Sequence, residues 1–205
     1  MILIACAVET ELAFWNPRHG VELLATGVGP VEAACAVAHA LGQQRYHLVV
    51  NAGIAGAFDG AAQVGDGVVV VDDALELALE TGHPILLPQG QRVVDKAHSD
   101  PRLAATLTAR GFAPAHGITV ARVTSTQETA ARLARAGAQV ESMEGFAVLR
   151  AAERAGVPAI ELRGISNRVG PREQSGWDFA AGVRGLERVL LALFDLLDTA
   201  SEHSA

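Results

Sequence analysis

Acidic and amide side chains follow directly after apolar runs of this sequence, where they could do chemistry. Glu9 and Glu11 come after the run "ILIACAV", and Asn167 comes after "AIELRGI". In α/β proteins ligands gather at the carboxyl ends of strands. A carboxylate in a dry cleft there could act as a general base, because desolvation raises its pKa. Acids in the first turn of a helix also simply complement the helix dipole, which explains both glutamates equally well.

The stretch "VESMEGF" (140–146) offers a third carboxylate. Ser142 is a candidate cap for a helix that begins near Met143, which would place Glu144 in the first turn. The dipole would keep that carboxylate ionised, and an ionised carboxylate can accept hydrogen bonds from a vicinal diol such as the ribose 2′- and 3′-hydroxyls. Dipole complementarity alone is the alternative for Glu144, and a core position is the alternative for Met143.

Glycine pairs follow two other apolar runs. Gly27 and Gly29 precede a helical pattern, and Gly53 and Gly56 lie in "NAGIAGAF". Glycines at such places let the backbone approach a ligand or a neighbouring helix, and a tight turn without any ligand explains them as well. The dinucleotide fingerprint is incomplete here and the lysine of a phosphate-binding loop is missing.

The elements that must position these residues alternate along the chain. Near-continuous apolar runs predict strands buried on both faces, and apolar residues at helical spacing predict helices between them. We therefore expect an α/β three-layer sandwich around a mainly parallel or mixed sheet. The least regular part, 74–98, predicts an extra hairpin or a surface loop. The predicted strands are 2–8, 47–53, 68–73, 117–123 and 159–165, and the predicted helices are 31–41, 143–155 and 179–197.

Composition narrows the class of protein. The 205 residues suit one domain, which we expect over 1–198, followed by a polar tail over 199–205. A net charge of -7 without a basic stripe gives no support to nucleic-acid binding, and no apolar run is long enough to cross a membrane. Two cysteines without metal or redox spacing indicate reduced thiols and a cytoplasmic protein. The seven histidines show no metal-ligand spacing.

Taken in order, five motifs give a more specific indication. The segments "ACAVETEL", "TGVGPVEAA", "NAGIAGAF", "VESMEGFAV" and "RGISNRVG" together resemble the purine nucleoside phosphorylase / methylthioadenosine nucleosidase superfamily, over residues 2–197. The resemblance implies an α/β fold with a mixed, partly barrel-like central sheet. It also implies a small-molecule nucleoside substrate, no metal or organic cofactor, and a homodimer or a higher homo-oligomer.

The resemblance also implies roles for individual residues. Glu11 matches the acid that, in the hydrolase branch, activates water for attack at C1′. Glu144, next to Met143, matches the glutamate that binds the ribose, and Gly53 lies where the backbone approaches the substrate. Asn167 matches the position that contacts the purine around N7. Ser125 and Thr126 belong to "TSTQET" (124–129), where the family lines the base pocket.

Two departures from the family pattern concern the substrate. Ile54 replaces a hydroxyl residue that many nucleosidases carry, and Asn167 replaces the Asp of the methylthioadenosine nucleosidases. An Asn amide has two N–H donors, which match N7 and O6 of a 6-oxopurine better than the edge of adenine. Because an unpaired buried acceptor costs roughly 1–3 kcal/mol, this difference favours hypoxanthine as the leaving base.

This preference for hypoxanthine agrees with one branch of the superfamily, and the resemblance to that branch implies hydrolysis of a nucleoside whose 5′ side carries a carboxyphenyl ketone. Arg168 and Arg172 are candidates to bind that carboxylate, although both are equally explained as surface arginines. Three alternatives stay open: a methylthioadenosine/S-adenosylhomocysteine nucleosidase, a purine nucleoside phosphorylase, and a catalytically silent binding protein on the same scaffold.

Overall fold

The strands form an eight-stranded mixed sheet that closes on itself. The computed structural model describes residues 1–78, 82–83, 85–91, 93–171, 173 and 176–202. Strand β8 pairs with both β3 and β4, so that β3, β7, β6, β4 and β8 form a barrel, while β1, β2 and β5 extend it. The strands are β1 (Ile2–Cys6), β2 (Val21–Ala25), β3 (Leu48–Ala57), β4 (Gly67–Leu75), β5 (Lys96–His98), β6 (Ala113–Thr119), β7 (Val140–Ser142) and β8 (Ala159–Arg168).

Both pairing directions occur in this sheet, as expected. Strand β1 runs parallel to β2 and β3, and β3 runs parallel to β8. Strand β7 is antiparallel to β3, and β4 is antiparallel to β5 and β8. Each of the five predicted strands corresponds to an observed one. We did not predict β2, β5 or β7, because two of them have only three residues and β2 is partly exposed on both faces.

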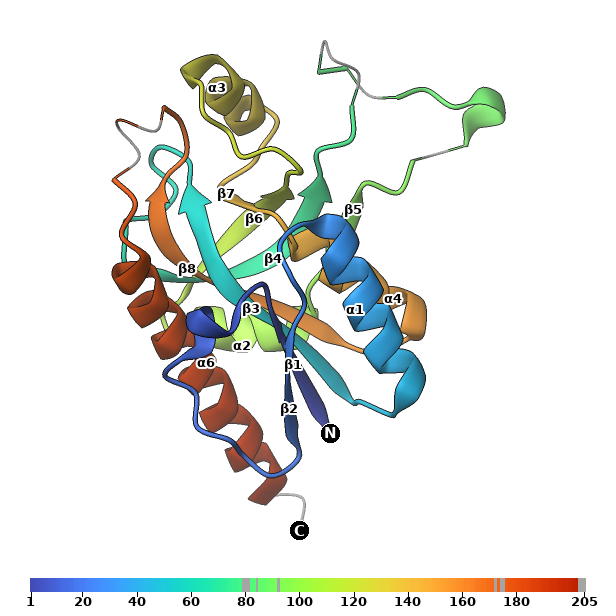
Figure 1. Cartoon of the computed structure of the whole chain (residues 1–205), viewed down its shortest axis with the longest axis vertical. Helices are drawn as coiled ribbons and strands as arrows, with labels where there is room; N and C mark the ends of the chain where they lie inside the picture. Colours follow the sequence, from blue (N-terminus) through green and yellow to red (C-terminus); the bar gives the residue numbers. More distant parts are fainter. Residues whose placement is uncertain (79–81, 84, 92, 172, 174–175, 203–205) are drawn as a thin grey trace.

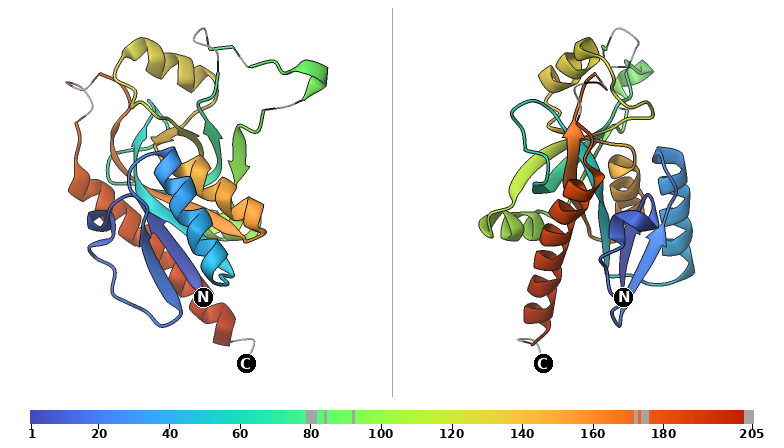
Figure 2. Two further views of the ribbon diagram at one scale, coloured as in Figure 1. Left: turned by 45° about the vertical axis from the view of Figure 1, so that its right-hand side comes forward. Right: turned by 60° about the vertical axis from the view of Figure 1, so that its left-hand side comes forward.

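Helices cover the sheet on two sides (Figures 1 and 2). Helices α1 and α4 pack against each other on one side, and α6 packs along β8, β4 and β3 on the other. These layers confirm the predicted α/β sandwich with a partly barrel-like sheet. The helices are α1 (Pro30–Gln43), α2 (Pro101–Ala109), α3 (Gln127–Arg135), α4 (Gly145–Ala155) and α6 (Phe179–Glu202), and there are short 3-10 helices η1 (Glu9–Leu12) and η2 (Pro88–Gly90).

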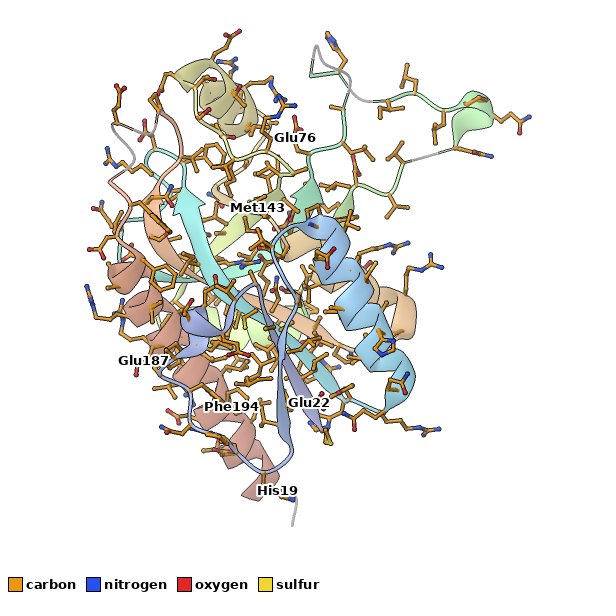
Figure 3. The ribbon with its side chains drawn as sticks, viewed as in Figure 1. His19, Glu22, Glu76, Met143, Glu187 and Phe194 are labelled. Atoms are coloured by element: carbon orange, nitrogen blue, oxygen red, sulfur yellow. The ribbon has the colours of Figure 1, made fainter. Side chains whose placement is uncertain are left out.

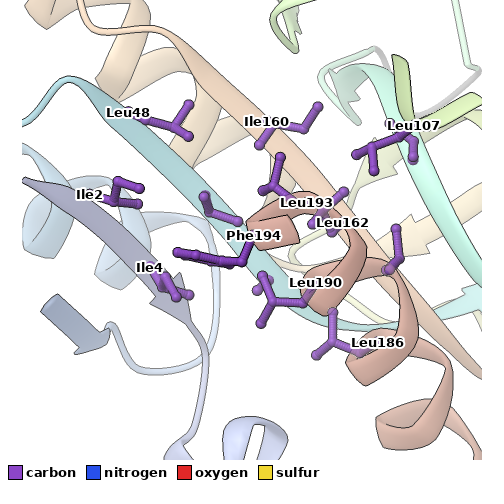
Figure 4. Close-up of a cluster of buried hydrophobic side chains, with 14 of the residues drawn as sticks. Ile2, Ile4, Leu48, Leu107, Ile160, Leu162, Leu186, Leu190, Leu193 and Phe194 are labelled. Carbon is purple, nitrogen blue, oxygen red and sulfur yellow. The ribbon is translucent and has the colours of Figure 1, made fainter. Parts of the chain in front are cut away.

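The larger of the two main apolar clusters lies against the apolar face of α6. Leu186, Leu190 and Leu193 are fully buried, and they pack with Ile160 and Leu162 of β8 (Figure 4). A second apolar cluster lies between the α1–α4 layer and strands β1 and β3. Burial of this area is the main stabilising contribution to the fold. The packing of these two clusters holds in place the strands whose ends carry the polar residues of the predicted site.

Several boundaries differ from the predictions. Helix α4 begins at Gly145, close to the predicted start near Met143, and α6 continues to Glu202, into the segment 199–205 for which we expected a polar tail. Helices α2 and α3 were not predicted. Their start signals were present, however, because Asp100 and Thr126 accept hydrogen bonds from the first-turn N–H groups of these helices.

For the segment 74–98 we expected an extra hairpin or a surface loop, and its described part is a long, largely irregular connection between two paired strands. Strands β4 and β5 pair antiparallel, and the chain between them stands away from the body of the molecule (Figure 1). Residues 79–81, 84 and 92 of this segment lie outside the described residues. No helix in the described part of the chain is long and apolar enough to cross a membrane.

Candidate active site

A cavity of about 530 Å³ opens where several strands end. Four of the predicted site residues line it: Glu11, Met143, Glu144 and Asn167. Met143, labelled in Figure 3, lies where β7 leads into α4. Residues that are more than a hundred positions apart in the sequence therefore meet in one cavity, which is large enough for a small ligand.

Three backbone N–H groups bind the Glu11 carboxylate. Oε2 accepts from Ala7 (3.0 Å) and Val8 (3.1 Å), and Oε1 accepts from Ile54 (2.9 Å). The side chain is only 4% exposed, and burial raises the pKa of Glu11 although the Ile54 hydrogen bond and the charge of Arg163 lower it. A fixed, desolvated carboxylate at the wall of a cavity can accept a proton from a bound water molecule.

The Glu144 carboxylate is also buried and fixed. Oε1 accepts a hydrogen bond of 2.8 Å from the backbone N–H of Gly29, which joins the glycine turn before α1 to this site. Glu144 is the N-cap residue of α4 and not a residue of its first turn. The cap hydrogen bond comes instead from Ser142, whose Oγ accepts from Gly145 N at 3.2 Å.

Arg163 is a buried cation beside these two carboxylates, and we did not predict it. Its Nε is 2.8 Å from Oε1 of Glu161, and its Nη2 is 3.3 Å from Oγ of Ser142. Burial lowers the pKa of Arg163, but the charges of Glu161, Glu144 and Glu11 outweigh burial and raise it. The signal in the sequence was a glutamate and an arginine two positions apart within an apolar strand.

A second buried acid, Asp73 of β4, lies next to this ion pair. Burial and the charge of Glu161 raise the pKa of Asp73 well above its ordinary value, although Thr119 donates a hydrogen bond of 2.7 Å to its Oδ1. Burial also raises the pKa of Glu161, while Arg163 lowers it. The ion pair with Arg163 therefore favours the charged form of Glu161, whereas burial and the charge of Glu161 favour the protonated form of Asp73.

Two glycines of β3 make close approaches at this site. A Cβ atom on Gly53 would lie 2.5 Å from Nη1 of Arg163 and 3.0 Å from Oε1 of Glu11. Gly53 therefore accommodates the protein's own side chains and is not among the cavity-lining residues, whereas Gly56 is. A Cβ atom on Gly56 would lie 2.9 Å from Nδ2 of Asn167.

The amide of Asn167 already has partners on both sides. Its Oδ1 lies 2.9 Å from Oγ of Ser166, and its Nδ2 donates to the carbonyl oxygen of Arg168 at 2.8 Å. One N–H therefore remains for a ligand, which corrects our expectation of two free donors. The remaining N–H still suits N7 or O6 of a purine.

The other predicted site residues do not line the cavity. Ser125 and Thr126 are exposed, and Thr126 caps α3, so that Thr124 is the residue of this stretch that reaches the wall. The side chain of Arg168 is 66% exposed, and its Nη1 is 3.9 Å from Asp59. Arg172 lies outside the described residues.

Sequence reasoning missed several parts of the wall. Besides Thr124 they include the buried Glu141, and the aromatic residues Trp177 and Phe179, whose rings meet edge to face with centroids 6.1 Å apart. Cys6 is near Glu11, but burial raises the pKa of its thiol to about 12, so it is not a thiolate nucleophile.

Comparison with known proteins identifies the family. The profile of the phosphorylase superfamily matches residues 15–200. The futalosine hydrolase of Streptomyces coelicolor is 38% identical over 196 residues, which cover 90% of this chain and 83% of the relative. The chain belongs to the futalosine hydrolase family of this superfamily. The family member from Thermus thermophilus is 34% identical over 182 residues, covering 85% of this chain and 81% of the relative.

Solved structures agree with the fold of the family. The methylthioadenosine/S-adenosylhomocysteine nucleosidase of Streptococcus pneumoniae, bound to a transition-state inhibitor, matches with a TM-score of 0.78 and 21% identity, over 94% of this chain and 97% of that chain. The S-adenosylhomocysteine nucleosidase of Streptococcus pyogenes matches with a TM-score of 0.78 and 22% identity, over 96% of each chain. These similarities confirm the predicted nucleoside phosphorylase-like fold.

Proposed function

We propose that this protein hydrolyses the N-glycosidic bond of futalosine and releases hypoxanthine and dehypoxanthine futalosine. The observation that carries the proposal is the meeting of Glu11, Glu144 and Asn167 in one cavity, in a chain 34–39% identical to futalosine hydrolases. The reaction belongs to the alternative route of menaquinone biosynthesis, and we place the protein in the cytoplasm.

Glu11 acts on the nucleophile in this mechanism, and Arg163 acts on the charge of the site. A water molecule beside the Glu11 carboxylate gives it a proton as its oxygen attacks C1′. The C1′–N9 bond breaks, its electron pair leaves with the purine, and the purine takes a proton from solvent. Arg163 balances the negative charges of the two glutamates, which would otherwise repel each other across the site.

Glu144 and Asn167 hold the two halves of the substrate. The second oxygen of the Glu144 carboxylate accepts from the ribose hydroxyls, while Gly29 fixes the first. The remaining N–H of Asn167 donates to the purine at N7 or O6, where negative charge develops as the glycosidic bond breaks. Hydrogen bonds that strengthen with that charge lower the barrier.

The aromatic residues of the cavity wall support the proposal that the 5′ group of the substrate is aromatic. Trp177 lines the cavity while remaining 62% exposed, and Phe179 lies beside it. Such a surface suits the carboxyphenyl ring of futalosine, which an aromatic pair can contact edge to face. Arg168 and Arg172 remain the candidates for the carboxylate itself, and Ser125 and Thr126 remain candidates for contacts made when substrate is bound.

Product analysis tests the proposal. Purified protein is incubated in phosphate-free buffer with futalosine, with methylthioadenosine and with S-adenosylhomocysteine, and the released base is separated by chromatography. We expect hypoxanthine from futalosine and little adenine from the other two. Efficient release of adenine without turnover of futalosine would contradict the substrate, and turnover that requires phosphate would indicate a phosphorylase.

A further inference from the structure

Glu141 of β7 is a buried acid of the cavity wall that the mechanism above does not use. It is 7% exposed and lines the same cavity as Glu11 and Asn167. Its Oε1 accepts from the backbone N–H of Thr124 at 3.1 Å, whereas its Oε2 has no hydrogen-bond partner among the described residues. A buried acceptor without a partner is unfavourable, so a donor supplied by the ligand would stabilise it.

The register of the sheet places Glu141 opposite Asn167. Gly56 of β3 is paired with Glu141 on β7 and with Asn167 on β8. Directly paired residues of neighbouring strands present their side chains on the same face. The two polar side chains therefore flank Gly56 on one face, on strands roughly 10 Å apart across two strand spacings. A side chain on Gly56 would meet Nδ2 of Asn167 and Cγ2 of Val169, each at 2.9 Å, so the glycine lets Asn167 pack against β3. Glu141, Gly56 and Asn167 all line the cavity in which a flat ring would lie.

The edge of a 6-oxopurine fits this pair of side chains. Hypoxanthine has acceptors at N7 and O6 and a donor at N1–H, whereas adenine has an acceptor at N1 and a donor at its 6-amino group. Asn167 has one N–H left to donate, which suits N7 or O6. Burial raises the pKa of Glu141, and hydrogen bonds from Thr124 lower it. In its ionised form the carboxylate only accepts, so it suits N1–H and not N1 of adenine.

We propose that Glu141 accepts a hydrogen bond from N1–H of the base and thereby selects a 6-oxopurine over a 6-aminopurine. This inference rests on the proposed function, because it assigns the group that recognises the base in that reaction. Glu141 has no role in breaking the bond. It is a specificity-determining residue on the side of the cavity opposite Asn167.

A purely structural role for Glu141 gives a different expectation. Its hydrogen bond to Thr124 N anchors the chain between β6 and α3. The variant Glu141→Gln keeps that bond, because a Gln carbonyl oxygen accepts from the same N–H. Its NH₂ group then replaces the second oxygen and donates, which opposes N1–H of hypoxanthine and matches N1 of adenine. Only the recognition role predicts a change of base preference.

The experiment compares three substrates with the wild type, one test variant and one control variant. The substrates are futalosine, its N1-methyl analogue and its 6-amino analogue. For the wild type we expect kcat/KM to be at least about tenfold lower with both analogues than with futalosine. In Glu141→Gln we expect kcat/KM for futalosine to fall about ten- to hundredfold and the preference over the 6-amino analogue to be lost. The control Glu9→Gln, an exposed acid outside the wall, should keep the wild-type preference.

Binding of free bases separates this inference from the proposed function. Titration calorimetry of the wild type with hypoxanthine, 1-methylhypoxanthine and adenine needs no turnover and no variant. Tighter binding of hypoxanthine than of the other two supports the role of Glu141 even if futalosine is not cleaved. Equal binding of hypoxanthine and 1-methylhypoxanthine would overturn it. So would a folded Glu141→Gln enzyme with the wild-type preference.

Discussion

At the scale of single residues, Glu11 is the residue to which we assign the chemistry that distinguishes a hydrolase from a binding protein. Replacing it with Gln keeps the shape but removes the proton acceptor, and one amide NH₂ would face backbone N–H donors. We expect Glu11→Gln to lower kcat for futalosine about 10²- to 10⁴-fold. Glu9→Gln, the exposed neighbour on η1, is the matched control and should stay near wild type. Steady-state kinetics with futalosine measure both variants, and unchanged turnover in Glu11→Gln would refute the mechanism.

The pH dependence should follow from the same carboxylate. Burial raises the pKa of Glu11 above its ordinary value of 4.5, and only the ionised form accepts a proton. Activity should therefore be full above the raised pKa and lost as pH falls through it. A profile of kcat/KM against pH measures this acid limb, which should lie above pH 4.5. The limb should be absent from the residual activity of Glu11→Gln.

Asn167 should control which base leaves. In Asn167→Asp, a protonated carboxyl can donate to N7 and accept from a 6-amino group, while the ionised form repels O6. We expect kcat/KM for futalosine to fall about ten- to hundredfold and the relative rate with the 6-amino analogue to rise. Competition between the two substrates in one reaction measures the ratio directly. An unchanged ratio would mean that the amide does not contact the base.

At the scale of elements, the inward faces of β4 and β8 carry a buried charge arrangement that is open to test. Asp73→Asn replaces an acid whose protonated form the fold favours by a neutral amide of the same shape. Because the folded pKa of Asp73 is raised, the contribution of Asp73 to stability is fully present below its ordinary pKa of 3.8 and is lost as pH rises toward the folded pKa. That loss is about 1.4 kcal/mol per pH unit.

The variant Asp73→Asn should not show this fall. The free energy of unfolding is measured for both proteins by urea titrations between pH 4 and 7. The value for Asp73→Asn minus the value for the wild type should increase steadily as pH rises. Glu161→Gln should instead destabilise the protein by about 3–5 kcal/mol, because it leaves Arg163 without its partner. A constant difference between Asp73→Asn and wild type across pH would show that Asp73 is ionised in the fold.

The elements also explain how far the sequence could predict the site. The local pattern placed Glu11 and Asn167 after apolar runs, but it explained Glu11 equally well by the helix dipole. The roles of both residues came from the resemblance to the superfamily. Arg163, Glu161 and Asp73 were missed because an apolar strand with a charged pair gives no sign of which strands close the barrel around it. Glu141 was missed for the same reason, since β7 has only three residues and its position depends on pairing with β3 and β6.

At the scale of the whole molecule, the strand–helix alternation predicted the layers but not the closure. The sheet closes because β8 pairs with β3 on one side and β4 on the other, and such long-range pairing leaves no local pattern. The resemblance to the nucleosidase superfamily supplied the barrel-like sheet in advance. The resemblance also implies a homodimer, and this stays a prediction.

The chain between β4 and β5 is the surface at which we expect the two copies of the homodimer to meet. Four of its apolar side chains are exposed: Leu77 (41%), Leu86 (92%), Leu87 (37%) and Val94 (51%). Exposed apolar side chains grouped on one segment are typical of an interface, and we predict that a second copy of this chain covers them. Light scattering should give twice the chain mass of 21.3 kDa.

Charge introduced at the most exposed of these positions should separate the copies. We expect Leu86→Glu to give monomers at concentrations where the wild type is dimeric, since the new carboxylate would be buried without a partner. Leu191→Glu is the control, because Leu191 is an exposed leucine of α6 on the body of the molecule (36%). Sedimentation velocity over a hundredfold range of concentration distinguishes the species. A wild-type monomer throughout, or a Leu86→Glu dimer of wild-type affinity, would exclude this segment as the interface.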